Sequence, residues 1–291
     1  MNDRAPAAKF TLSQEDIDKI LGTIDLPPCP VIVTEVMTEA QRDEPDLNRL
    51  AEIFARDPGM SAVAIKLANS VLFCGGAPVA NVRRALDRLG TRNVVSIIVA
   101  AALRTSLGGQ ETELVERYWH RASGLATASG LVARRVYGLS PDLAYLYGLF
   151  RDAAVPVLIR RFPDYLDTIE TGTRQGLPRD LVEAAAFPCT HADVGYLLVH
   201  NWKLPDEIGQ AIRFHHDRDA YALDDDVLPE AALALIAAAH VGDHLISQVL
   251  GADDGELDEA LFAKAQAHLG IRGEDMDDLR EAVEAALSET A

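Results

Sequence analysis

The sequence has few cysteines and no long apolar run, and each shortage excludes a class of protein. Its three cysteines, Cys29, Cys74 and Cys189, lie far apart without a CxxC pair, which excludes a zinc knuckle and a disulfide framework. The longest apolar run, 94–103, is far shorter than the roughly 20 residues that a membrane-spanning helix needs. No apolar stretch follows the first residues, so no secretory signal is visible. We therefore expect a cytoplasmic protein that does not bind membranes.

Positive charge is also scarce, because 27 Lys and Arg stand against 45 Asp and Glu, a net charge of −18. Nucleic acids and anionic membranes are bound by clustered Lys and Arg, so we expect neither as a partner. A helix-turn-helix over 50–69 fails for the same reason, since its second helix offers only Lys66 as a basic group. The acidic surface favours protein partners of basic or mixed charge.

Helical periodicity runs through the chain, and no segment alternates convincingly as a strand does, which predicts an all-α fold. Shorter helices separated by Pro and Gly turns fill the first part of the chain. After Gly108-Gly109, long helices rich in Ala and Leu follow, and 143–162 is expected to be one of them. We predict a two-lobed helical bundle, with an N-terminal lobe over 1–108 that packs against a second lobe over 109–291.

Histidine and aspartate residues recur along the second lobe on several predicted helices. In chain order they are His120, Asp152, His191, His215, His216 and Asp243. Each of them alone is an ordinary polar residue of a helix. As an ordered series they point to metal chemistry, because imidazoles and carboxylates from several helices converge on divalent ions in bundle cores.

This order resembles that of the HD-domain phosphohydrolases, above all the HD-GYP branch, which cleaves cyclic di-GMP. There, a Leu-Leu-His-Asp-Ile-Gly-Lys segment supplies two metal ligands and a nearby lysine. The present chain reads Leu-Phe-Arg-Asp-Ala-Ala-Val at 149–155, so Arg151 replaces the histidine and Val155 replaces the lysine. The Gly-Tyr-Pro that follows the His-His pair in that branch is absent, because 217–221 reads Asp-Arg-Asp-Ala-Tyr. Activity against cyclic di-GMP is therefore not expected.

Short motifs in the first lobe resemble a related family, the HDOD domain (HD-related output domain). They are Leu-Pro-Pro-Cys-Pro at 26–30, Arg-Asp-Pro-Gly-Met at 56–60, Lys-Leu-Ala-Asn-Ser at 66–70 and Ala-Leu-Asp-Arg-Leu-Gly at 85–90. Trp-Lys-Leu-Pro at 202–205 continues the match, which runs from about Leu26 to about Asp217. HDOD proteins are regarded as regulatory modules of bacterial signalling without an established common activity. The resemblance thus implies an HD-like second lobe and a non-enzymatic signal-transduction module that acts through protein partners.

Arg151 determines what we expect of the metal centre. Its guanidinium is a permanent cation, which repels a charge a few ångströms away by about 4 kcal/mol per unit charge pair at an effective dielectric of about 20. We therefore expect no cofactor, and Arg151 paired with Asp152 or Asp243 in place of a metal. The alternative is a single residual divalent metal held by the histidine and aspartate series. That alternative implies residual phosphohydrolase activity, or a sensor that binds a nucleotide or phosphate at Arg151.

Overall fold

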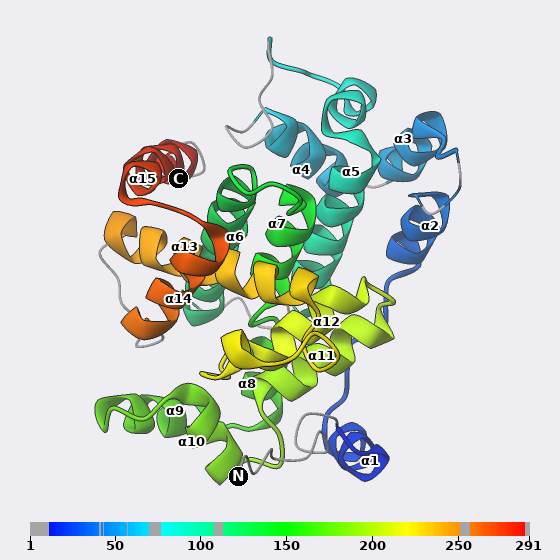
Figure 1. Ribbon diagram of the computed structural model, residues 1–291. Coiled ribbons are helices and arrows are strands. Elements are labelled where there is room, and N and C mark those ends of the chain that lie inside the picture. The colour runs from blue at the N-terminus through cyan, green and yellow to red at the C-terminus, as the bar shows by residue number, and fades with distance from the viewer. Residues whose placement is uncertain are drawn as a thin grey trace.

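The computed structural model describes residues 12–40, 42, 44–56, 58–69, 77–107, 113–250 and 257–288. Regular structure in these ranges is helical and contains no strand, so the all-α prediction is confirmed (Figure 1). The helices before the predicted boundary are α1 (Gln14–Thr23), α2 (Val31–Ala40), α3 (Leu47–Ala55), α4 (Pro58–Ala68) and α5 (Val82–Leu107). Those after it are α6 (Glu113–Ala133), α7 (Pro141–Phe150), α8 (Val155–Arg161), α9 (Tyr165–Arg174), α10 (Arg179–Ala186), α11 (His191–Asn201), α12 (Asp206–Phe214), the 3-10 helix η2 (Ala220–Ala222), α13 (Glu230–Leu250), α14 (Glu259–Leu269) and α15 (Gly273–Ser288).

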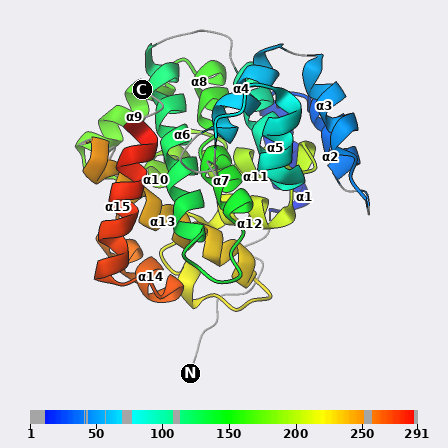
Figure 2. The same cartoon turned by 90° about the horizontal axis from the view of Figure 1, so that it is seen from above.

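The two groups of helices lie side by side. Figure 2 shows α2 to α5 on one side and α6, α13 and α15 on the other, with α7 between them. Contacts between α5 and α7 join the groups, and the indole Nε1 of Trp202 donates to the carbonyl of Pro27 at 3.0 Å. Gly108 and Gly109, where the boundary was predicted, lie outside the described residues.

Local signals in the sequence explain where several helices begin and bend. Ser13 and Asp16 form a capping box at the start of α1, and Asp46 caps α3 by accepting from the backbone N–H of Asn48. Within α5 the backbone of Gly90 has φ 72°, so the helix is kinked there. This left-handed conformation costs glycine little, because glycine has no Cβ.

One predicted helix is wrong. Residues 143–162 form two helices, because α7 ends at Phe150 and α8 begins at Val155. Pro156 explains the break, since its ring has no N–H to donate and clashes with the carbonyl four residues earlier, that of Asp152. Instead, the backbone N–H of Val155 donates to that carbonyl at 2.9 Å. The break places Arg151 and Asp152 in a tight turn inside the bundle.

Helix α13 is long and apolar enough to cross a membrane by length and composition, and it is the one described helix that passes this test. Its most apolar window is 61% buried, and it contacts α6, α7, α12, α14 and α15. This burial is that of a core helix, which is apolar nearly all round because other helices surround it.

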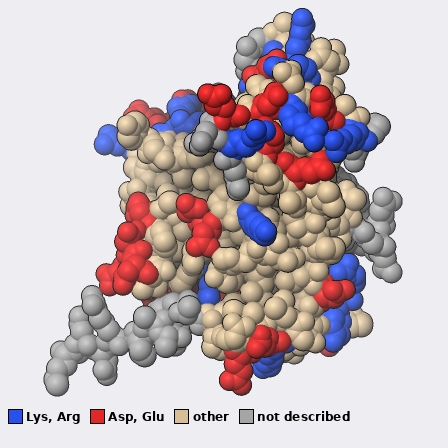
Figure 3. Space-filling view, turned by 90° about the vertical axis from the view of Figure 1, so that its right-hand side faces the viewer, with Lys and Arg blue, Asp and Glu red and all other residues tan. Residues whose placement is uncertain are grey.

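Charged residues on the face shown in Figure 3 gather in small mixed groups. Lys and Arg lie beside Asp and Glu along its upper part, and uncharged residues cover most of its centre. A continuous basic stripe, which a nucleic-acid backbone requires, is not present among the described residues of this face.

Candidate functional site

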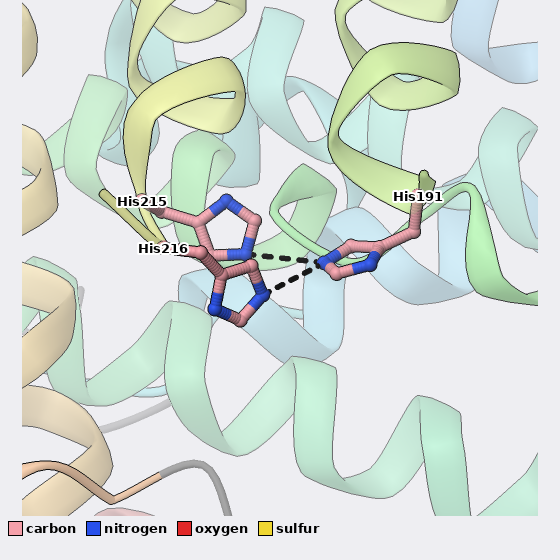
Figure 4. A group of neighbouring side chains, drawn as sticks. All are labelled: His191, His215 and His216. Carbon is pink, nitrogen blue, oxygen red and sulfur yellow. Dashed lines mark hydrogen bonds between the residues drawn. The ribbon is translucent and has the colours of Figure 1, made fainter. Parts of the chain in front are cut away.

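Three imidazoles and one carboxylate meet where α11, α12 and the break between α7 and α8 come together. The Nε2 atom of His191 lies 3.2 Å from Nε2 of His215 and 3.0 Å from Nε2 of His216 (Figure 4). The Oδ1 atom of Asp152 lies 3.4 Å from Nε2 of His191 and 3.7 Å from Nε2 of His215. His191 and His215 are buried and His216 partly so. We call these four residues the histidine cluster.

Helix ends position the cluster. Thr190 caps α11 in a reciprocal capping box with Asp193, so His191 is the first residue of that helix. His215 is the C-cap of α12, and His216 follows it directly. Side chains at helix ends leave the helix body in directions that a mid-helix residue does not have, which lets three imidazoles from two helices face one point.

Hydrogen bonds at the Nδ1 atoms of His191 and His215 determine which ring nitrogen of each residue is unprotonated in its neutral form. Nδ1 of His191 lies 2.7 Å from the carboxylate of Glu183, and Nδ1 of His215 lies 2.5 Å from the carbonyl of Ile212. Carboxylates and carbonyls accept, so both Nδ1 atoms carry a proton, and in the neutral form of each ring the lone pair lies on Nε2, which faces the cluster. The Oδ1 atom of Asp152 is also buried there and accepts no hydrogen bond. When both imidazoles are neutral, lone pairs therefore face one another.

The pKa values of the cluster reflect this crowding. Burial, together with the neighbouring His215 and His191, holds the pKa of His216 well below its ordinary value. Burial also opposes protonation of His191, but the carboxylate of Glu183 outweighs it and the pKa of His191 is raised. Burial opposes ionisation of Asp152, but the guanidinium of Arg151 together with His215 and His191 outweighs it, and the pKa of Asp152 lies well below its ordinary value. The cluster therefore holds one carboxylate, one imidazole whose protonation is favoured and one whose protonation is disfavoured.

Arg151 lies on the far side of the Asp152 carboxylate from the histidines. Its Nε and Nη2 atoms donate to Oδ2 of Asp152 at 3.0 and 2.9 Å, and its Nη1 donates to Oδ2 of Asp243. Arg151 is 2% exposed. The sequence predicted a pair with Asp152 or with Asp243, and Arg151 makes both. Val155, at the lysine position of the HD-GYP motif, is buried and brings no charge to the site.

Two of the predicted ligand residues lie outside the histidine cluster. Asp243 binds arginines with both of its oxygens, since Oδ1 accepts from Nη2 of Arg121 at 3.0 Å. His120 is exposed on α6 and is not brought into the cluster. Consecutive residues of an α-helix point about 100° apart, and on α6 it is Arg121 that turns toward the interior.

Comparison with known proteins identifies the family of the chain. The HDOD domain matches residues 26–218. The chain belongs to the HDOD family. It is similar in fold to a "Putative phosphohydrolase" from Shewanella amazonensis SB2B, with a TM-score of 0.73, 20% identity, and coverage of 96% of this chain and 99% of that chain.

Two further relatives of this HDOD protein are matched over different shares of their own length. A "Putative signal transduction protein" from Marinobacter aquaeolei VT8 has a TM-score of 0.69 and 20% identity over 98% of this chain and 68% of that one. An uncharacterized protein of Treponema pallidum (strain Nichols) is 23% identical over 201 residues, 66% of this chain. The HDOD chain spans only 38% of the length of that curated relative.

Three imidazoles of this HDOD site, those of His191, His215 and His216, could hold one divalent ion, because their ligand nitrogens lie within 4.8 Å of one another. Ligand atoms about 2.0–2.1 Å from a tetrahedral zinc ion lie about 3.3 Å from one another, close to the 3.2 and 3.0 Å that separate Nε2 of His191 from Nε2 of His215 and of His216. His191 and His215 also donate their Nδ1 protons to oxygen acceptors, as metal-bound histidines do. A second ion does not fit, because Arg151 and Arg121 already neutralise Asp243.

Sequence reasoning missed Glu183 and His240. Nothing in the sequence around Glu183 distinguishes it from the exposed acids of other helices. The sequence does indicate His240, because it lies one helical turn before Asp243 and therefore on the same face of the helix. Its Nε2 donates to the carbonyl of His215 at 3.3 Å while its Nδ1 accepts from the hydroxyl of Tyr221 at 3.0 Å. Burial and the cation of Arg151 lower the pKa of His240 to about 3, so it acts as a neutral bridge between α13 and the cluster.

Proposed function

We propose that this HDOD protein is a non-enzymatic regulatory module that acts by binding another protein. The observation that carries the proposal is the buried guanidinium of Arg151 between Asp152 and Asp243. Phosphodiester hydrolysis by two metal ions needs both metal positions. The permanently charged guanidinium of Arg151 stands in place of one of them. The family's regulatory character and the similarity in fold to the Marinobacter protein support the same function.

We further propose that the histidine cluster holds a single divalent ion with a structural role. From sequence we expected no metal, but the unpaired Oδ1 of Asp152 and the facing Nε2 atoms favour the one-ion alternative. A bound ion supplies a cross-link between elements far apart in sequence. His191, His215, His216 and Asp152 would hold it, and they join α11, α12 and the turn after α7.

The alternative of a residual phosphohydrolase or phosphate sensor has less support. Arg151 directs three donor atoms at its two carboxylate partners, so the guanidinium is already neutralised. The cavity beside Asp243, lined by His240, His244 and Phe262 among others, measures about 20 Å³. Ligand sites for small molecules usually measure about 300–1,000 Å³, so a nucleotide does not fit there without rearrangement.

Turnover tests the non-enzymatic part of the proposal. Protein loaded with Mn²⁺ or Zn²⁺ is incubated with cyclic di-GMP and with bis(4-nitrophenyl) phosphate, and product is measured by chromatography and absorbance. We expect no hydrolysis above the protein-free blank, because the second metal position is filled by Arg151. Hydrolysis that Asp152→Ala abolishes would instead establish the residual phosphohydrolase. Capture of a protein partner from the source cell by the metal-loaded chain tests the regulatory part.

Metal content tests the one-ion part. Elemental analysis of protein purified without chelator is expected to give about one equivalent of a divalent transition metal per chain, which His215→Ala removes. His200→Ala is the matched control, because His200 is an exposed histidine of α11 and should leave the metal content unchanged. A wild-type chain without metal supports the empty centre, and two equivalents contradict the role assigned to Arg151.

A further inference from the structure

The buried carboxylate of Glu183 on α10 contacts His191 of the histidine cluster. Glu183 is 0% exposed, and its Oε2 atom accepts from the backbone N–H of His191 at 2.8 Å and from Nδ1 of the same residue at 2.7 Å. Its Oε1 atom accepts from the hydroxyl of Tyr165 on α9. Two N–H groups and one hydroxyl face its two oxygens, which is the arrangement that an acceptor-only carboxylate requires. Three hydrogen bonds from two residues compensate the buried charge.

Glu183 determines the tautomer of His191. A carboxylate can only accept, so the proton of neutral His191 must lie on Nδ1. That leaves Nε2 bare, and Nε2 is the atom that faces His215 and His216. If the acceptor at Nδ1 were lost, the proton could move to Nε2 and direct an N–H, in place of a lone pair, into the cluster.

Glu183 and Tyr165 also belong to a hairpin of two helices, α9 and α10, which contacts few other helices of the bundle. Helices α9 and α10 pack tightly on each other, since a Cβ on Gly172 would lie 2.3 Å from Cγ2 of Val182. Figure 1 shows the pair projecting from the lower part of the molecule, and its main contacts outside itself are with α8 and α11. The hairpin carries three exposed leucines, Leu166, Leu177 and Leu181. The hydrogen bonds of Glu183 therefore connect the buried cluster to an exposed surface.

We propose that Glu183 is a positioning residue that fixes His191 for cation binding and, with Tyr165, couples the cation site to the docking of the α9–α10 hairpin. This inference rests on the one-ion site of the proposed function. Outer carboxylates of this kind raise the affinity of metal-bound histidines by about 10–100-fold. In this protein the same carboxylate also anchors a surface element, so an ion bound at the cluster makes the hairpin more rigid. Ion binding in the buried cluster is thereby linked to an exposed element of the molecule.

The experiment compares Glu183→Ala, Glu183→Gln and Tyr165→Phe with the wild type. In Glu183→Ala we expect the Kd for Zn²⁺ to rise about 10–100-fold by calorimetric titration. Glu183→Gln keeps an acceptor for Nδ1–H and should restore part of the affinity, and it remains informative if the alanine variant does not fold. Glu170→Ala is the matched control, because Glu170 is an exposed carboxylate on the same hairpin and should leave the Kd unchanged.

Two readouts separate positioning from a merely structural role. Long-range ¹H–¹⁵N spectra of the metal-free protein should show His191 with its proton on Nδ1 in the wild type and partly on Nε2 in Glu183→Ala; His191→Gln identifies the signal. Hydrogen exchange should slow in α9 and α10 when Zn²⁺ binds to the wild type, and this protection should be lost in Glu183→Ala and weakened in Tyr165→Phe.

The possible failures can be told apart. Unchanged Zn²⁺ affinity together with an unchanged His191 tautomer in Glu183→Ala overturns the positioning role. Wild-type protection of α9 and α10 that does not respond to Zn²⁺ overturns the coupling to the hairpin. A wild-type chain that binds no Zn²⁺ refutes the one-ion site instead, and the spectra of the metal-free protein still decide whether Glu183 positions His191.

Discussion

Replacing Arg151 with methionine is expected to lower the free energy of unfolding by about 3–5 kcal/mol, because it leaves buried carboxylates without their partner. Methionine fills much of the volume of the arginine stem, so the change removes charge more than packing. Asp152 loses both donors to its Oδ2 atom, while Asp243 keeps Arg121. Urea denaturation of the metal-free protein, followed by circular dichroism, measures the difference.

Two further variants decide whether the lost charge is the cause. Arg174→Met removes an exposed arginine from a surface pair with Glu170 and should change the free energy of unfolding by less than about 1 kcal/mol. Adding Asp152→Asn to Arg151→Met removes one of the unpaired charges and should recover part of the loss. If Arg151→Met is as stable as the wild type, the guanidinium is not a substitute for a metal ion.

Replacing Trp202 with alanine is expected to lower the free energy of unfolding by about 3–5 kcal/mol, because it empties a large buried volume between the end of α7 and the segment that joins α1 to α2. Trp202 is 1% exposed, and its ring packs edge-on against that of Phe150 with the ring centroids 5.9 Å apart. Its Nε1 donates to the carbonyl of Pro27. The same side chain thus packs beside the end of α7 and holds the segment between α1 and α2. The unfolding midpoint in urea measures the loss.

Trp202→Phe is the conservative comparison. It keeps an aromatic ring against Phe150 and removes the N–H, but Asn201 still donates to the carbonyl of Pro27 at 3.2 Å. We therefore expect a smaller loss, of about 1 kcal/mol for the hydrogen bond plus the smaller ring volume. The double variant Asn201→Ala/Trp202→Phe leaves that carbonyl without either donor and should cost more than the two single changes together. Equal losses for Trp202→Ala and Trp202→Phe would show that packing at this position matters little.

The sequence by itself determined the fold class and the family. Helical periodicity and helix caps are local signals, because each depends on residues within one or two turns, and they carried the all-α prediction. The ordered motifs from Leu26 to Asp217 carried the family. The replacement at Arg151 was read from the sequence, and its pairing with Asp152 or Asp243 was predicted because a buried guanidinium needs a carboxylate; the structure has both pairs.

Only the tertiary structure decided which side chains share the site. Whether His120 or Arg121 faces the interior depends on the rotation of α6 against its neighbours, which sequence order does not specify. Glu183 became part of the site because α10 packs beside the start of α11, a contact between helices that no local pattern announces. The facing lone pairs of His191 and His215 arise from acceptors on other residues. The electrostatic character of a metal site depends on such distant partners, because hydrogen bonds and burial act through space rather than along the chain.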